Sequence, residues 1–192
     1  HDIRTPLTRL KLQIAKKKQK ELTKRMSKDI DEMEKMLNDY LQFAKTQAVE
    51  ETSNVNMKNL FSEIKNIIDN KNLIFTDIES VILKGRFSSL KRCFENIIQN
   101  GLNYGTKVYV KFIIKKKTLT VDIEDDGPGI PDHQYKNVFK PFFRLDESRN
   151  LNKAGVGLGL AIVEDIINSH GGNIQLGRSK HKGLLVKISL PF

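Results

Sequence analysis

The spacing of the apolar residues changes once along this chain, and the change limits what the chain can fold into. Over residues 1–47 apolar side chains recur at intervals of three and four, which is the period of an amphipathic helix. From residue 58 onward such helical spacing is interspersed with short runs of alternating apolar and polar residues, as in β-strands. We therefore expect an N-terminal helical part and a C-terminal part of mixed α and β structure.

The N-terminal part is predicted to be an antiparallel helical hairpin. Its apolar positions form two sets, Leu7–Ile14 and Ile30–Ala44, and residues 16–21 between them contain no apolar side chain. Two helices of this length bury too little surface to be stable alone, so we expect two copies to pair as a dimeric four-helix bundle. We assign residues 1–48 to this hairpin. Because the chain starts at His1, the first helix is expected to be truncated at its N-terminus.

The rest of the chain is predicted to be an α+β sandwich over residues 58–192. Residues 48–56 are polar and lose the helical period, so they are expected to form a linker. A glycine-punctuated stretch, 127–157, lacks a regular pattern. The expected helices are 60–68, 87–104 and 158–169, and the expected strands are 73–78, 81–83, 108–114, 119–123, 174–176 and 184–190.

Composition excludes several classes of function. The formal net charge is +10, but the basic residues are spread along the chain and no nucleic-acid-binding motif accompanies them, so we expect no nucleic-acid partner. The single Cys93 rules out an internal disulfide and is expected to be buried and inert. No apolar run approaches the roughly 20 residues of a membrane helix. We expect a cytoplasmic chain, with any membrane segment preceding His1 in a longer parent.

The first motif that carries chemistry is the octet HDIRTPLT, residues 1–8. On a helix, His1 and Thr5 lie four positions apart and, with Asp2, flank one exposed face. A neutral imidazole is a competent nucleophile for phosphoryl groups when one of its nitrogens is held protonated, and Asp2 is placed to hold it. Pro6 lacks an N–H group and is expected to kink the helix beside the histidine.

A second group of residues suits a cation and phosphate. Asn96 and Asn100 place two amide carbonyls on one face of the predicted helix 87–104. Hard cations prefer oxygen ligands of this kind. In a chain rich in asparagine, such a pair also occurs by chance.

Two glycine-containing stretches follow. In Asp125-Asp126-Gly127-Pro128-Gly129, a carboxylate at the end of a predicted strand can accept a hydrogen bond from an exocyclic amine, and the glycines allow close approach. The second stretch, residues 155–160, enters the predicted helix 158–169, whose free N–H groups would face an anion. It is no dinucleotide fingerprint, because Leu160 occupies the sixth position, and no P-loop.

Between the glycine stretches lies a segment with three phenylalanines, residues 138–149. Phe139 and Phe142 are expected to be core anchors. Arg144, and less strongly Arg149, could neutralise charge on a phosphate.

Along the chain, the five motifs occur in the same order as those of the sensor histidine kinases of two-component systems, which they resemble over essentially the whole chain. The sequence HDIRTPLTR resembles in particular the EnvZ osmosensor subgroup. The resemblance implies that His1 is phosphorylated, that Asp2 is its general base, and that Thr5 positions water for dephosphorylation of the partner response regulator.

The resemblance also implies a Bergerat-type ATP-binding fold with ATP and Mg²⁺ as cofactors. Asn100 is the implied Mg²⁺ ligand, Asp125 the adenine-reading residue, and Arg144 part of a lid that approaches the γ-phosphate. The other implied nucleotide contacts are Asn96, Tyr104, Gly127, Gly129, Gly155, Gly157, Gly159 and Leu160. Two positions depart from the family pattern: Asn103 replaces a basic residue, and Val156 replaces a hydroxyl-bearing one.

The implied function is autophosphorylation on His1 within a homodimer, followed by transfer to an aspartate of a response regulator, of the OmpR type in this subgroup. Regulator phosphatase activity and a parent protein in the bacterial inner membrane are implied as well. Two alternatives remain open. One is an ATPase of the gyrase, Hsp90 and MutL superfamily, for which Glu95 lies near the hydrolytic position. The other is a nucleotide-binding module that has lost phosphoryl transfer.

Overall fold

The computed structural model describes residues 26–27, 30–31, 33, 50–145 and 157–192. The chain divides into two units, His1–Val49 and Glu50–Phe192. In the first unit the described residues are helical and Ile30 is buried, in agreement with the second helix of the predicted hairpin. The remainder of that hairpin, including its expected turn at 16–21, lies outside the described residues.

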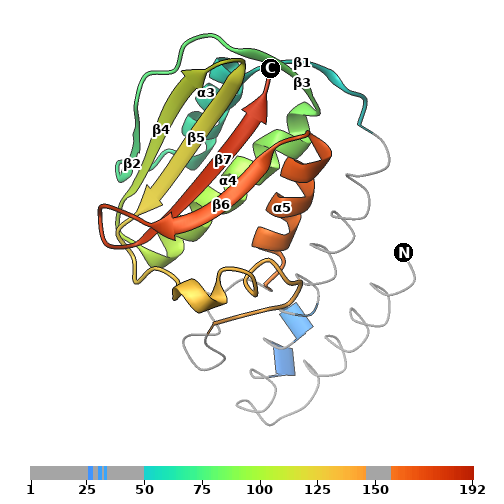
Figure 1. Ribbon diagram of the computed structural model, residues 1–192. Helices are drawn as coiled ribbons and strands as arrows, with labels where there is room; N and C mark the ends of the chain where they lie inside the picture. The colour runs from blue at the N-terminus through green and yellow to red at the C-terminus, as the bar shows by residue number, and fades with distance from the viewer. Residues whose placement is uncertain (1–25, 28–29, 32, 34–49, 146–156) are drawn as a thin grey trace, which may run out of the picture. The chain divides into compact units, whose positions relative to one another are not determined.

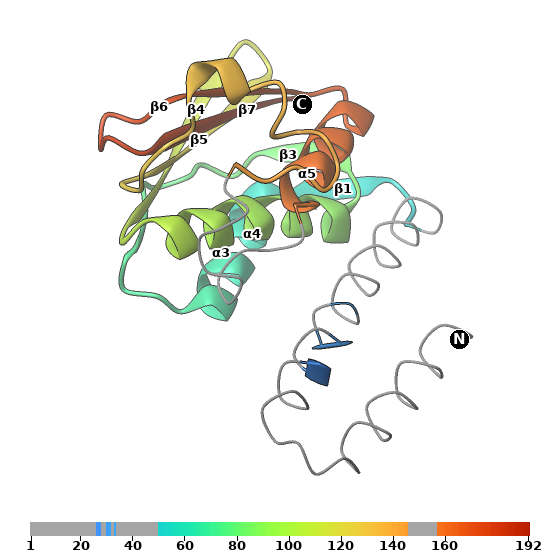
Figure 2. The same cartoon turned by 90° about the horizontal axis from the view of Figure 1, so that it is seen from below.

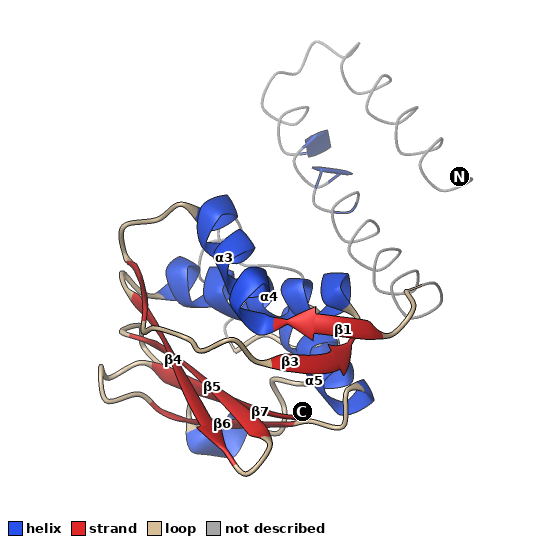
Figure 3. Ribbon diagram, turned by 90° about the horizontal axis from the view of Figure 1, so that it is seen from above, coloured by secondary structure: helices blue, strands red, loops and turns tan. Residues whose placement is uncertain are grey.

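The second unit is a two-layer α+β sandwich, as predicted (Figures 1 and 2). Its five-stranded sheet has the order β2-β4-β5-β7-β6, in which β2 pairs with β4 in parallel and the other neighbours are antiparallel. The three α-helices of this unit gather on one face of the sheet (Figure 3). The elements of the unit are β1 (Ser53–Asn56), α3 (Met57–Ile68), β2 (Leu73–Phe75), β3 (Ile82–Gly85), α4 (Phe87–Tyr104), β4 (Val108–Lys115), β5 (Thr118–Asp125), the short 3-10 helix η1 (Asp132–Gln134), α5 (Gly159–Ser169), β6 (Asn173–Arg178) and β7 (Leu184–Pro191).

The core lies between the helices and the sheet. In β5, Leu119, Val121 and Ile123 are buried, while the residues between them are partly exposed, which is the two-residue period of a strand with one covered face. Of the apolar positions spaced along the predicted helix 87–104, Leu90, Phe94, Ile97 and Ile98 are buried on α4 and Leu102 is partly exposed. The ring of Phe61 on α3 contacts that of Phe94 on α4, with centroids 4.6 Å apart, and so joins the two helices.

The prediction of a linker over residues 48–56 is wrong for Ser53–Asn56. These residues form β1, which pairs antiparallel with β3 in a separate two-stranded sheet. Val55 is 1% exposed and is the buried apolar residue of this strand. A polar stretch with a single buried residue shows no alternation of apolar and polar residues that could reveal a strand. The strand forms by pairing with residues about 30 positions away.

Other predictions for this unit are confirmed. Helix α4 begins and ends at the predicted residues, and β6 and β7 form the predicted hairpin. Cys93 is fully buried, and burial raises the pKa of its thiol. Among the described residues, no helix combines the length and apolarity that crossing a bilayer requires.

Candidate active site

Helices α4 and α5 bring the asparagine pair and the second glycine stretch together. A Cβ atom added to Gly159, the first residue of α5, would lie 3.4 Å from the side-chain amide nitrogen of Asn100. One turn earlier on α4, the amide nitrogen of Asn96 is buried and has no hydrogen-bond partner among the described residues. Buried polar groups are nearly always hydrogen-bonded, so an orphaned amide at this position fits a bound polar ligand.

The N-terminus of α5 is open to an anion. Its N-cap residue is Leu158, whose side chain makes no capping hydrogen bond, and its first turn contains no acidic residue. Its free N–H groups and the positive end of the helix dipole are therefore available to phosphate. Gly157, with φ 82°, lets the chain turn tightly just before the helix, where a Cβ would lie 2.8 Å from the carbonyl oxygen of Phe143. Gly155 lies outside the described residues.

The phenylalanine segment, residues 138–145 of which are described, is hydrogen-bonded to the loop at Gly157. The N–H group of Phe142 donates to the carbonyl of Gly157 at 3.0 Å. The prediction that Phe142 is a core anchor is wrong: its side chain is 61% exposed, at a residue that has a left-handed φ of 65°. Nη2 of Arg144 is buried without a partner among the described residues, which fits an anionic ligand. Arg149 lies outside the described residues.

Asp125 ends β5 as a buried carboxylate. Its Oδ1 accepts hydrogen bonds from the N–H groups of Gly127 at 2.9 Å and Leu184 at 3.1 Å. Burial raises the pKa of Asp125; the two N–H groups offset part of this effect, and the charge of Asp126 adds to it. Gly101, which follows Asn100 on α4, lies against Asp125, since a Cβ added there would be 3.5 Å from the Asp125 Cβ.

The neighbouring Asp126 holds a loop instead. Its Oδ1 accepts from the N–H groups of Thr106 at 2.7 Å and Lys107 at 2.8 Å, and its Oδ2 accepts from the Thr106 hydroxyl. These bonds, that of the Thr106 hydroxyl above all, lower the pKa of Asp126 to about 2. Both carboxylate oxygens of Asp126 already accept hydrogen bonds from the α4–β4 loop. The geometry therefore favours Asp125 as the carboxylate that binds a ligand.

Gly183, in the β6–β7 hairpin, is a site residue that sequence reasoning missed. A Cβ on Gly183 would overlap the Asp125 carboxylate and lie 2.6 Å from the Gly127 nitrogen. Gly129, with φ 72°, approaches the same hairpin, because its Cβ would be 3.2 Å from the Gly183 carbonyl oxygen. The only local signal was a lone glycine between two strands, and nothing in the sequence links it to a residue 58 positions earlier.

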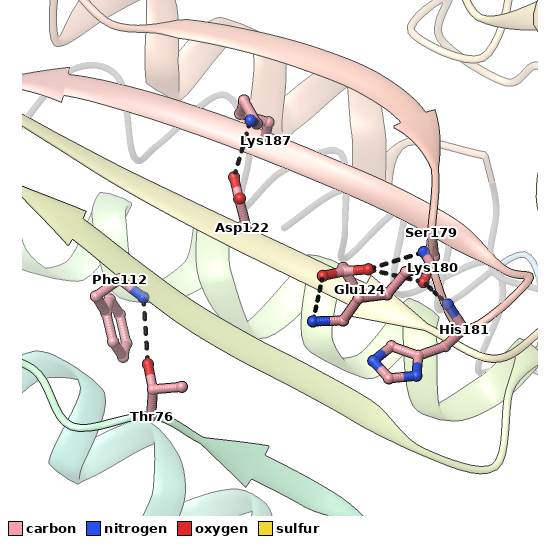
Figure 4. A network of polar contacts seen from close by, with 8 residues as sticks. All are labelled: Thr76, Phe112, Asp122, Glu124, Ser179, Lys180, His181 and Lys187. Carbon is pink, nitrogen blue, oxygen red and sulfur yellow. Dashed lines mark hydrogen bonds and ion pairs between the residues drawn. The ribbon is translucent and has the colours of Figure 1, made fainter.

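A polar network fixes this hairpin onto β5, as Figure 4 shows. Oε2 of Glu124, the residue before Asp125, accepts from the Ser179 hydroxyl at 3.0 Å and from the Lys180 N–H group at 3.1 Å. The His181 ring stacks on Tyr109 of β4 with centroids 3.8 Å apart. The strand end that carries Asp125 and the hairpin that carries Gly183 are thus bonded together beside the site.

The other predicted residues fall into two groups. Tyr104, at the end of α4, is 58% exposed, and its carbonyl oxygen lies 2.9 Å from where a Cβ on Gly127 would be. Leu160 is partly exposed in the first turn of α5. The predicted phosphoacceptor residues, His1, Asp2 and Thr5, lie outside the described residues.

Comparisons with known proteins match both parts of the chain. Residues 1–49 match the family described as the His Kinase A (phospho-acceptor) domain. Residues 85–192 match the histidine kinase-, DNA gyrase B-, and HSP90-like ATPase family. The sensor histidine kinase CpxA of Escherichia coli K12 is 35% identical over 211 residues, which cover 100% of this chain and 45% of CpxA. The chain therefore spans about half the length of this relative.

Solved structures share the fold of the second unit. The mycobacterial sensor histidine kinase MprB has a TM-score of 0.63 and 27% identity, covering 74% of this chain and 97% of that one. The histidine kinase domain of the E. coli osmosensor EnvZ has a TM-score of 0.58 and 30% identity, covering 75% and 91%.

Proposed function

Since this chain belongs to the sensor histidine kinases of two-component systems, which are ATP-dependent protein-histidine kinases, we propose that it transfers the γ-phosphoryl of ATP to His1 and then to a response-regulator aspartate. Its fold combines the phosphoacceptor domain with the ATP-binding domain of that family. One observation carries the proposal for the site. Two consecutive residues of α4 contact its two halves: Asn100 lies beside the start of α5, and Gly101 lies against the buried Asp125.

The two halves suit the two ends of ATP. Asp125 would accept a hydrogen bond from the adenine amino group, with Gly127 and Gly129 giving close access. The phosphates would be bound by the N–H groups at the start of α5, beyond Gly157, and by the Arg144 nitrogen that has no partner among the described residues. Gly155, Leu160 and Tyr104 belong to the same proposed contacts.

Asn100 would hold Mg²⁺, with Asn96 beside it on the same helical face. The buried, unpartnered amide of Asn96 supports a polar ligand there. The ion, when bound, neutralises charge on the phosphate oxygens during transfer.

At the phosphoacceptor, Asp2 would accept a hydrogen bond from the protonated imidazole nitrogen, leaving the other nitrogen free to attack the γ-phosphorus of ATP in line. As the new P–N bond forms, the bond to the β–γ bridging oxygen breaks, ADP leaves, and Asp2 takes the imidazole proton. Thr5 would position water for hydrolysis of the phosphorylated regulator, which makes phosphatase activity part of the proposal. These roles rest on the motif HDIRTPLT.

The proposed assembly is a homodimer through residues 1–48, with the ATP-binding domain, predicted over 58–192, acting on it. The proposed partner is a response-regulator receiver domain of the OmpR type, with no nucleic acid bound. The chain would be the cytoplasmic part of a sensor held in the bacterial inner membrane by residues outside it. The gyrase-type alternative is disfavoured by the match of residues 1–49 to a phospho-acceptor domain.

Asp125→Asn tests the proposed adenine contact. The amide oxygen would keep the bonds from Gly127 and Leu184, leaving an NH₂ group where the adenine amine needs an acceptor. Losing a hydrogen bond to a charged group costs about 1.5–3 kcal/mol, so we expect ATP affinity to fall roughly 10- to 100-fold in calorimetric titration. Asp122→Asn, three residues earlier on the same strand and paired with Lys187, is the control and should change the affinity less than about twofold. Equal affinities for Asp125→Asn and the parent chain would contradict the assignment.

A further inference from the structure

The first residue of the second unit is bonded to helix α4 by its side chain. Glu50 follows Val49, where the first unit ends. Its Oε1 accepts from the N–H group of Ser88 at 2.7 Å. Its Oε2 accepts from the N–H group and the hydroxyl of Ser89, at 3.1 Å and 2.9 Å. The chain is therefore fastened to α4 at the residue where it enters this unit.

Glu50 takes the place of a local helix cap. The N-cap position of α4 is Arg86, whose side chain makes no capping bond, and the first turn contains no acidic residue. The carboxylate of Glu50 supplies both the hydrogen-bond acceptor and the negative charge that a helix N-terminus favours. Burial opposes its ionisation, but the bonds from Ser88 and Ser89 outweigh burial, and the pKa of Glu50 lies below its usual value.

The same end of α4 is bonded to the end of α5. The N–H group of Arg86 donates to Nε2 of His170 at 3.0 Å, so the His170 proton must sit on Nδ1, which donates to the carbonyl of Ile166. Burial lowers the pKa of His170 and keeps the ring neutral, as this acceptor role requires. The two helices are antiparallel, because Asn100, late in α4, lies beside Gly159 at the start of α5.

Glu50 thus lies at one end of a helix pair whose other end forms the proposed phosphate site. We propose that Glu50 is a positioning residue for phosphoryl transfer. Its carboxylate fastens the first residue of the second unit to the α4–α5 pair, so that residue 50 moves with the proposed ATP site as one body. This inference rests on the function proposed above.

Loss of the hydrogen bonds from Ser88 and Ser89 to Glu50 would lengthen the unrestrained connection before β1. The next fixed point is β1, which begins at Ser53, so freeing Glu50 adds about three residues of unrestrained chain. A longer, unrestrained connection lowers the effective concentration and the orientational order of the site relative to His1. ATP binding itself does not involve Glu50, so its affinity is expected to remain.

The test distinguishes two roles of Glu50: a tether, which fastens residue 50 to α4, and a helix cap that only stabilises α4. In the full chain, Glu50→Ala should lower the rate of His1 labelling at saturating ATP on the order of 10-fold, lower the Tm, and change ATP affinity less than about twofold. Adding Arg86→Asp supplies a local cap to α4 but removes the hydrogen bond that Nη2 of Arg86 donates to the Ser169 hydroxyl at 2.6 Å. The Tm of the double variant should therefore rise to that of Arg86→Asp alone, while its labelling rate should stay at that of Glu50→Ala. Arg86→Asp alone completes the double-mutant cycle. The matched control is Glu51→Ala, which removes an exposed carboxylate next to Glu50.

Recovery of the labelling rate in the double variant would overturn the proposal, because Glu50 would then be only a cap. The proposal would also be overturned if Glu50→Ala lowered the ATP affinity by the same factor as the rate of His1 labelling. Amide hydrogen exchange gives a readout independent of activity: residues 50–52 should exchange faster in Glu50→Ala and in the double variant. If the parent chain is not labelled, the proposed function fails, and the exchange of residues 50–52 alone decides whether the tether exists.

Discussion

Replacing Asn100 by alanine is expected to reduce labelling of His1 by roughly 100-fold or more at saturating ATP. Such losses are typical when a group that stabilises charge in the transition state is removed. Asn100 lies beside the start of α5. In the function proposed above, its amide oxygen would hold the ion that neutralises the phosphates. The measurement is the initial rate of phosphoryl incorporation over a series of Mg²⁺ concentrations.

The control for this variant is Gln99→Ala, an exposed position on the same helix. It should label at the parent rate. Because Asn100 is only partly buried, its replacement should leave the Tm within a few degrees of the parent value. A folded Asn100→Ala chain that labels at more than half the parent rate would remove Asn100 from the metal site.

Replacing Gly183 by alanine is expected to destabilise the second unit and weaken ATP binding together. The added Cβ would overlap the carboxylate of Asp125 and crowd the nitrogen of Gly127. Backbone atoms cannot rotate away, so the hairpin and the end of β5 must separate. Overpacking of this kind costs about 1–3 kcal/mol or more. We expect a lower Tm and a fall in ATP affinity of about tenfold, since the Asp125 carboxylate is displaced.

Gly177→Ala is the matched control on the same hairpin. Its Cβ would meet the Leu185 side chain at 3.6 Å, an ordinary contact distance. The Tm and the ATP affinity should therefore stay close to those of the parent chain. A Gly183→Ala chain with unchanged Tm and affinity would show that the hairpin does not fix Asp125.

The regular elements could be predicted because their signals are local. Helix α4 repeats apolar residues at helical spacing and ends where Gly105 follows, so both of its ends agree with the structure. The strands β4 and β5 alternate about a lysine turn in which Lys116 and Lys117 both have positive φ, as a tight hairpin requires. The motif residues Asn100, Asp125 and Gly159 could be named for the same reason, since each lies in a recognisable stretch.

The features that the sequence did not predict are contacts between distant segments. Strand β1 depends on its pairing with β3, and the cap of α4 comes from Glu50, 38 residues before Ser88. Gly183 matters only because folding places it against Asp125. Phe142 was expected in the core on its apolarity alone, but its backbone is hydrogen-bonded to Gly157 and its side chain is exposed. Spacing within a segment carries no information about such contacts.

Incubation of the chain with γ-labelled ATP and Mg²⁺ tests the central claim most directly. The account predicts a phosphoryl group on the protein that is stable in base and labile in acid, as expected for a phosphohistidine. It should be absent from a His1→Ala chain that binds ATP with the parent affinity. Release of labelled phosphate with no label on the protein, or label that persists in His1→Ala, would contradict it.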